Sequence, residues 1–336
     1  MRLCVGTSKG IVIIDPDRGR APLAVMANPS AISCMAQSAG QPHIIYVGSL
    51  EHTHMGDGPA SGTLSRSTDG GRTWSDITPA GAHDEGIWAV ATPPDAPGEV
   101  FIGTTHARLF HSQDHGHTFK ECTAFLDLPG RDRWTFPPPP HIPHVRAIAF
   151  DPVDPSLMYV GVEEGGVFRS RNRGASFEPL NKGLYPDVHA LAVDPADSRR
   201  LYATTGRGFY RSDTAGASWK FVGVMRPYVV PLLADAGAEG VVYTAGAAGP
   251  PPSWMARGAD AMLLVSNDAG HSFTAAAVPE VMWRGMVMAL LQCQMRPQEV
   301  FAVTTDGKVL RWRPREEEVV EIASNLPPAY AIAALP

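Results

Sequence analysis

An eight-residue pattern occurs five times along the chain, and it constrains the fold more than any other feature. The pattern is Ser-x-Asp-x-Gly-x-Thr/Ser-aromatic, and its copies begin at Ser67, Ser112, Ser170, Ser212 and Ser266. The intervals between successive copies are 45, 58, 42 and 54 residues. This is the length of one four-stranded propeller blade with loops of varying size. The repeat therefore predicts a β-propeller in which each copy marks one blade.

The residue types of the pattern suit a tight turn. An aspartate can accept hydrogen bonds from backbone N–H groups of its own turn, and glycine tolerates a positive φ. The closing Trp or Phe is placed to pack between neighbouring sheets, where an aromatic ring buries a large area. Asn172 keeps the accepting oxygen, whereas Thr214 replaces the carboxylate and is expected to weaken its turn. We interpret these turns as structural rather than catalytic.

Around each copy the same order of strands recurs. A small, apolar inner strand comes first, a second strand follows, and a third leads into the turn; seven inner and seven second strands are counted. The last inner strand, Tyr330–Leu335, has no second strand after it, and the opening Leu3–Gly6 has no inner strand before it. Pairing these two segments completes one blade and removes an exposed sheet edge.

The predicted fold is therefore all-β: a single seven-bladed β-propeller, closed by pairing the C-terminal inner strand with the N-terminal strands. The predicted blades are 1–27 plus 328–336, 31–78, 87–123, 145–181, 188–224, 229–278 and 286–323.

The turn pattern resembles the Asp-box (BNR) repeat of sialidases, xyloglucan hydrolases, sortilin-type receptors and photosystem assembly factors. The resemblance covers the fold and implies little about activity, because function lies in sites carried by a fold. It also implies a geometry, in which the connections between blades and between second and third strands emerge on the face opposite the turns. A sialidase would carry an opening Arg-Ile-Pro motif, and the nearest stretch here, HIPHVRAI, does not match it.

Composition excludes several classes of partner. The net charge is −6 and there is no basic block, so neither nucleic acid nor an anionic membrane is expected. No apolar run approaches the roughly 20 residues of a membrane helix, and the N-terminal residues lack a secretory pattern. The four cysteines lie far apart and are interpreted as reduced thiols. We expect a cytoplasmic protein with a small-molecule ligand, of undetermined oligomeric state.

Long loops and histidines gather on the predicted face opposite the turns. Three insertions, 50–62, 126–143 and 245–260, map there, and long loops in compact domains are commonly functional. Seven of the twelve histidines map to the same face, from the second blade to the fifth. They are His52, His54, His83, His106, His141, His144 and His189.

Imidazoles near a channel mouth predict a divalent metal, zinc or iron. Such metals accept nitrogen ligands, and a catalytic site holds three protein ligands with one position open. The candidate metal ligands are His83, His106, His144, His189, His52 and His54. The competing interpretation is a polar funnel whose histidines are hydrogen-bonded without a metal, and no fixed ligand spacing decides between the two.

The same face also supports metal-free acid–base chemistry, with a histidine base beside a carboxylate and arginines that hold an anionic group. The candidate catalytic residues are His144, His189, Arg146, Asp84, Glu85 and Glu163. The candidate ligand-binding residues are Arg108, Arg207, Tyr228, Trp254, Trp283, Arg284, Trp88 and Tyr330.

Three hypotheses about function follow. The first is an enzyme or binder for a small polar, anionic molecule, acting as a hydrolase or lyase with or without a metal. The second is a non-catalytic interaction or assembly scaffold. The third is a glycoside hydrolase that uses Asp84 and Glu163 as its pair of carboxylates.

Overall fold

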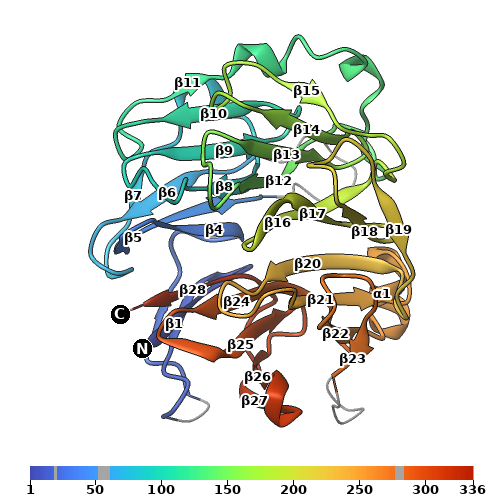
Figure 1. Ribbon diagram of the computed structural model, residues 1–336. Helices are drawn as coiled ribbons and strands as arrows, with labels where there is room; N and C mark the ends of the chain where they lie inside the picture. Colours follow the sequence, from blue (N-terminus) through green and yellow to red (C-terminus); the bar gives the residue numbers. More distant parts are fainter. Residues whose placement is uncertain (19–20, 52–60, 277–283, 336) are drawn as a thin grey trace.

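Seven four-stranded antiparallel sheets make up the molecule, as the repeat predicts (Figure 1). The computed structural model describes residues 1–18, 21–51, 61–276 and 284–335. The first sheet contains β28 (Ala329–Leu335), β1 (Arg2–Thr7), β2 (Gly10–Ile14) and β3 (Ala24–Met26). The second and third sheets contain β4 (Ile32–Ser38), β5 (Gln41–Ser49), β6 (Leu64–Ser67) and β7 (Ser75–Asp76), then β8 (Ile87–Ala91), β9 (Val100–Thr104), β10 (Leu109–Ser112) and β11 (Lys120–Glu121).

The remaining four sheets follow in chain order. The fourth and fifth contain β12 (Val145–Phe150), β13 (Met158–Val162), β14 (Gly166–Ser170) and β15 (Glu178–Pro179), then β16 (Val188–Asp194), β17 (Asp197–Thr205), β18 (Gly208–Ser212) and β19 (Lys220–Val222). The sixth and seventh contain β20 (Tyr228–Ala234), β21 (Val242–Ala247), β22 (Met262–Ser266) and β23 (Thr274–Ala275), then β24 (Val287–Cys293), β25 (Arg296–Thr304), β26 (Val309–Arg313) and β27 (Glu318–Ala323).

Short helical segments lie in the connections. They are η1 (Ala80–Ala82), η2 (Thr123–Phe125), η3 (Arg131–Arg133), α1 (Pro251–Arg257) and η5 (Pro314–Glu316). Among the described residues, no helix has the length and apolar character needed to cross a membrane.

The ring of sheets is closed by the last strand. β28 pairs antiparallel with β1, with Arg2 opposite Leu335 and Val5 opposite Ile332, so the two ends of the chain lie close together (Figure 1). β28 also contacts the first strands of both neighbouring sheets, β4 and β24. The contacts continue from β4 through β8, β12, β16 and β20 to β24. The seven first strands therefore surround the axis, and the predicted closure by the terminal strands is confirmed.

Neighbouring sheets approach each other closely where the second strand of one sheet carries a glycine. A Cβ atom on Gly48 would lie 2.5 Å from the side chain of Ile87 in the next sheet, and one on Gly103 would lie 2.4 Å from Val145. Because real Cβ atoms do not come this close, a side chain at either glycine would push the sheets apart. The same arrangement pairs Gly6 with Ile32 and Gly161 with Val188.

The five Ser-x-Asp turns share one hydrogen-bond pattern. In the first, Ser67 Oγ accepts the Gly71 N–H at 2.8 Å, and Asp69 Oδ1 accepts the Thr73 N–H at 2.9 Å. The hydroxyl of Thr73 donates to the second carboxylate oxygen at 2.6 Å. The equivalent acceptors in the other turns are Asp114, Asn172, Thr214 and Asp268. At Thr214 the hydroxyl accepts the backbone N–H, so this turn keeps that bond but lacks the carboxylate.

The turn aspartates are expected to make stability depend on acid pH. Hydrogen bonds from Thr73 lower the pKa of Asp69 to about 2, and those from Thr118 hold the pKa of Asp114 below its usual range. An aspartate in an unfolded chain has a pKa of about 3.9. Because the folded-state pKa is depressed, the stabilisation is complete above about pH 4 and is lost as the pH falls toward about 2.

We therefore predict that the double variant Asp69→Asn/Asp114→Asn is less stable than the parent at pH 7, since an amide accepts more weakly than a carboxylate. It should also lose less further stability between about pH 4 and pH 2. Urea unfolding at stepped pH measures both effects. The reverse change, Asn172→Asp, should add acid sensitivity to the fourth sheet, and equal pH slopes in all three proteins would contradict the assignment.

Candidate functional site

A β-bulge interrupts the first strand of every sheet near its start. The pairing with the second strand skips Trp88 in β8, Arg146 in β12 and His189 in β16. A bulged residue lies outside the ladder, and its side chain is re-aimed. Because the first strands surround the axis, the skipped positions form a ring around it, called the bulge ring below. Its other members are Ser33, Val230 with Pro231, Met288 and Tyr330.

Trp88, Arg146 and His189 lie on three consecutive sheets, and we call them the polar part of the bulge ring. The ring of Trp88 stacks on that of His144, with centroids 3.5 Å apart and planes 15° apart. The Arg146 guanidinium lies 5.6 Å from the centre of the same indole. On the next two sheets, Val230 and Met288 pack into an apolar cluster. Charged chemistry is therefore concentrated on the third to fifth sheets.

Glu163, in the turn between β13 and β14, is a buried carboxylate held by two neighbours. Its Oε2 lies 2.9 Å from His144 Nε2 and 3.5 Å from Arg146 Nε. A carboxylate accepts only, so Nε2 of His144 carries a proton and donates it to this bond. Burial lowers the pKa of His144, against the opposing effect of Glu163. Glu163 and Arg146 then carry opposite charges.

His189 and Asp187 form the second half of the site, at the start of β16. The Nδ1 atom of His189 lies 2.6 Å from the backbone oxygen of Val229, which accepts only, so Nδ1 carries a proton. Its Nε2 lies 3.3 Å from Asp187 Oδ1. Within the described parts of the chain neither atom has a hydrogen-bond partner, although both side chains are more than nine-tenths buried. Burial would lower the pKa of His189, but Asp187 and Glu163 outweigh it and raise the pKa.

Glu163, Asp187 and His189 bring one potential ligand atom each within 4.8 Å of one another. In the ranges that the structure describes, no other cluster of three His, Cys, Asp or Glu side chains meets this condition. We call these residues the central triad. Arg146 Nε is a further buried atom without a hydrogen-bond partner among the described residues. The ring of Tyr228 lies 4.8 Å from that of His189.

Two of the three insertions reach this region through aromatic side chains. Phe136, in the insertion 126–143, is edge-on to His144 with ring centroids 4.7 Å apart. Trp254, on α1, is edge-on to Tyr228 at 5.7 Å. Most of the insertion 50–62 lies outside the described residues. Sequence reasoning did not select Phe136, and its position directly before the proline run was the one available signal.

Three of the predicted site residues form a separate network on the third sheet. Arg108 Nε lies 2.7 Å from Glu121 Oε1, and its Nη1 lies 2.7 Å from Glu85 Oε1. His106 Nδ1 is 3.8 Å from the same Glu85 oxygen. These charges are paired with one another rather than directed at the central triad. The arrangement fits a structural role for Arg108 and Glu85.

The remaining predicted residues are more scattered. His83 and Asp84 are exposed directly after η1, and Arg284 is exposed beside Gly258. Arg207 is exposed and lies 4.5 Å over the ring of Tyr185. His52, His54 and Trp283 lie outside the described residues.

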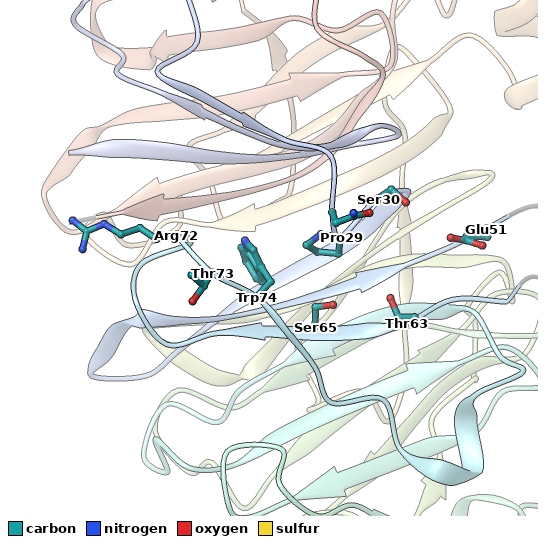
Figure 2. A pocket seen from close by; sticks show the side chains of 9 residues that line it. Pro29, Ser30, Glu51, Thr63, Ser65, Arg72, Thr73 and Trp74 are labelled. Atoms are coloured by element: carbon teal, nitrogen blue, oxygen red, sulfur yellow. The ribbon is translucent and has the colours of Figure 1, made fainter.

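Two surface pockets are lined by residues other than the central triad. One, of about 400 Å³, is lined by Pro29, Ser30, Thr63 and Trp74, beside the linker between β3 and β4 (Figure 2). A second, shallow pocket is lined by residues of the insertion 126–143 together with His106. Neither contains a member of the central triad.

Comparison with known proteins places the chain among β-propellers. No family model matches it. A xyloglucanase from a Paenibacillus species is 35% identical across 38% of this chain and 14% of that enzyme. Xyloglucanase Xgh74A of Acetivibrio thermocellus is 34% identical across 23% of this chain and 12% of the enzyme. The chain therefore spans less than a sixth of the length of these curated relatives.

Among solved structures, a GH74 xyloglucanase from Xanthomonas campestris matches with a TM-score of 0.63 and 16% identity, over 95% of this chain and 46% of that one. YCF48 bound to a D1 peptide matches with a TM-score of 0.61 and 15% identity, over 92% and 88% of the two chains. At these identities the likeness establishes the propeller fold.

We predict that Arg108→Ala destabilises the fold without affecting the central triad. The change leaves Glu85 buried without its cation, and breaking a buried ion pair costs several kcal/mol. The Arg108 side chain is 25% exposed, so solvent screening reduces the expected loss of unfolding free energy to about 2 kcal/mol. Urea denaturation measures this loss, and Arg108→Lys should fall between the two proteins. An unchanged unfolding midpoint would contradict the structural role.

Proposed function

We propose that the protein binds a small polar molecule at the polar part of the bulge ring and acts on it as a hydrolase or lyase. One observation carries this proposal: Arg146 Nε, Asp187 Oδ1 and His189 Nε2 are buried and lack hydrogen-bond partners among the described residues. An unpaired buried polar group costs about 1–3 kcal/mol. A polar ligand that pairs with these atoms would recover that free energy on binding.

The neighbouring groups support a division of roles. Arg146 can hold an anionic group through its guanidinium, since such pairs are strong and directional. The central triad provides carboxylates and an imidazole for proton transfer. The rings of Trp88 and Tyr228 provide apolar walls beside these charges. The shared hydrogen bonds of the five Ser-x-Asp turns further support placing the chain in the Asp-box class of propellers.

A thermal-shift panel of acetate, methylphosphonate, methyl phosphate and glucuronate tests ligand binding at this place. At least one probe should raise the melting temperature of the parent by several degrees, because ligand binding to the folded state stabilises it. Arg146→Ala and Asp187→Asn should abolish the shift. Arg199→Ala, which removes an exposed arginine on β17, is the matched control. A shift that survives in both site variants would place the ligand elsewhere, and a panel without shifts would favour an interaction scaffold.

A glycoside hydrolase is the second candidate, supported by the sequence similarity to xyloglucanases. Glu163 and Asp187 offer carboxylate oxygens within 4.8 Å of each other. Retaining glycosidases hold their two carboxyl groups about 5–5.5 Å apart. Asp84, the partner that the sequence suggested for Glu163, is instead exposed after η1. Asp187 is therefore the better candidate partner.

Release of reducing ends from xyloglucan, and of nitrophenol from chromogenic β-glucosides, tests this second candidate. If the pair is catalytic, Glu163→Gln and Asp187→Asn should each lower kcat by about 1,000-fold or more, as loss of a group essential to the chemical step does. Asp84→Asn should retain the parent rate. Equal rates in the parent and in the Glu163 and Asp187 variants, or no release by any of them, would exclude the assignment.

A further inference from the structure

We propose that the central triad, Glu163, Asp187 and His189, is a binding site for one divalent transition-metal ion of the zinc or iron(II) class. The inference deepens the proposed function and rests on it for the part that the metal plays in the reaction. The binding site itself rests on the hydrogen bond of His189, the two buried carboxylates, the spacing of the donor atoms and the groups that orient them.

The hydrogen bond of His189 fixes which nitrogen is available. Nδ1–H donates to the Val229 carbonyl, so Nε2 is the ring nitrogen that remains for a metal. Metal-binding histidines commonly use the other ring nitrogen in this way, donating to a backbone carbonyl or carboxylate. Here Nε2 lies 3.3 Å from Asp187 Oδ1, and the two atoms make no hydrogen bond with each other. A cation between the two atoms would be coordinated by both of them.

The buried formal charges of the site sum to a negative value, which a bound cation would offset. Glu163 and Asp187 carry two negative charges, and Arg146 contributes one positive charge beside Glu163. An uncompensated buried charge is costly. A divalent ion would change the sum over Glu163, Asp187 and Arg146 from −1 to +1, and the site would then attract an anionic group.

The donor atoms are close to the spacing that a metal requires. Zinc lies about 2.0–2.2 Å from nitrogen and oxygen ligands, so neighbouring donors in a zinc site are about 3–3.5 Å apart. His189 Nε2 and Asp187 Oδ1 already lie 3.3 Å apart. Since all three donors lie within 4.8 Å, Glu163 would need to move by about 1 Å. One imidazole and two carboxylates leave a coordination position open, as catalytic sites do.

Groups around the triad orient two of its members. His144 donates to Glu163 and is held in place by stacking on Trp88. Gly206 allows the backbone to approach Asp187, because a Cβ atom there would lie 2.0 Å from Asp187 Oδ2. Such second contacts position metal ligands in other proteins. His144 is thus a positioning residue, and a metal bound beside it would supply a Lewis acid for the substrate.

The test uses full-length protein purified without a nickel column, stripped with EDTA and titrated calorimetrically with Zn²⁺ or, under anaerobic conditions, Fe²⁺. The parent should bind one ion per chain. Asp187→Asn and His189→Gln should weaken the affinity by at least about 100-fold, and His144→Phe, which keeps the stacked ring, by about 10–100-fold. His271→Gln, which changes an exposed histidine in the last Ser-x-Asp turn, is the control and should bind as the parent does. Circular dichroism and thermal unfolding confirm that each variant is folded.

If a triad variant does not fold, anomalous scattering from a zinc-soaked crystal of the parent decides. The expected peak lies about 2.0–2.2 Å from His189 Nε2 and from one carboxylate oxygen of the triad. A peak elsewhere, or a folded parent whose affinity for both ions is weaker than about 1 mM, would overturn the inference.

The inference and the proposed function can fail separately. Metal binding at the triad without any response to methylphosphonate or acetate supports the inference and counts against the proposed function. A response to either anion by a parent protein that binds neither Zn²⁺ nor Fe²⁺ supports the proposed function and overturns the metal site. If both hold, Zn²⁺ should strengthen binding of methylphosphonate by about 10-fold or more, since the buried charge becomes positive.

Discussion

The close packing of each sheet against the next is the constraint on which this molecule depends. Where Gly48 meets Ile87 and Gly103 meets Val145, the absence of a side chain lets a β-branched residue enter the preceding sheet. This contact sets the distance between blades, and that distance decides whether the first strands can form a closed ring. The pairing of β28 with β1 then completes the ring with the same spacing. The arrangement of groups near the axis follows from this frame rather than from the loops alone.

Much of this frame can be predicted from the sequence, because the patterns that indicate it are local. The eight-residue turn pattern, the apolar inner strands and the unmatched strands at the two ends each concern a few consecutive residues, and together they predict seven blades and their closure. The position shared by Trp88, Arg146 and His189 also has a local signal, since each precedes an alanine of an inner strand. The structure places all three at bulges. The sequence did not indicate the bulge itself, because a bulge is an extra residue in one strand relative to its partner strand.

The partners of the charged residues depend on contacts between distant segments, and sequence reasoning could not assign them. The sequence suggested Arg108 as a ligand-binding residue, yet Glu121, from the outer strand β11, pairs with its guanidinium. Asp187 directly precedes the fifth inner strand, and the packing of β12 and β13 against β16 brings it beside Glu163. Counting histidines did not identify a cluster, because His83 is exposed and His144 is hydrogen-bonded to Glu163.

The bulge ring also bears on how such a propeller changes in evolution. A bulged residue takes no part in the ladder, so its replacement leaves the hydrogen bonds between strands in place. The seven blades therefore offer seven positions around one axis at which side chains can be exchanged one at a time. In this chain they range from a tryptophan and an arginine to a valine–proline pair. A lineage that keeps the frame can acquire new chemistry there blade by blade, and a library randomised at these positions would sample it directly.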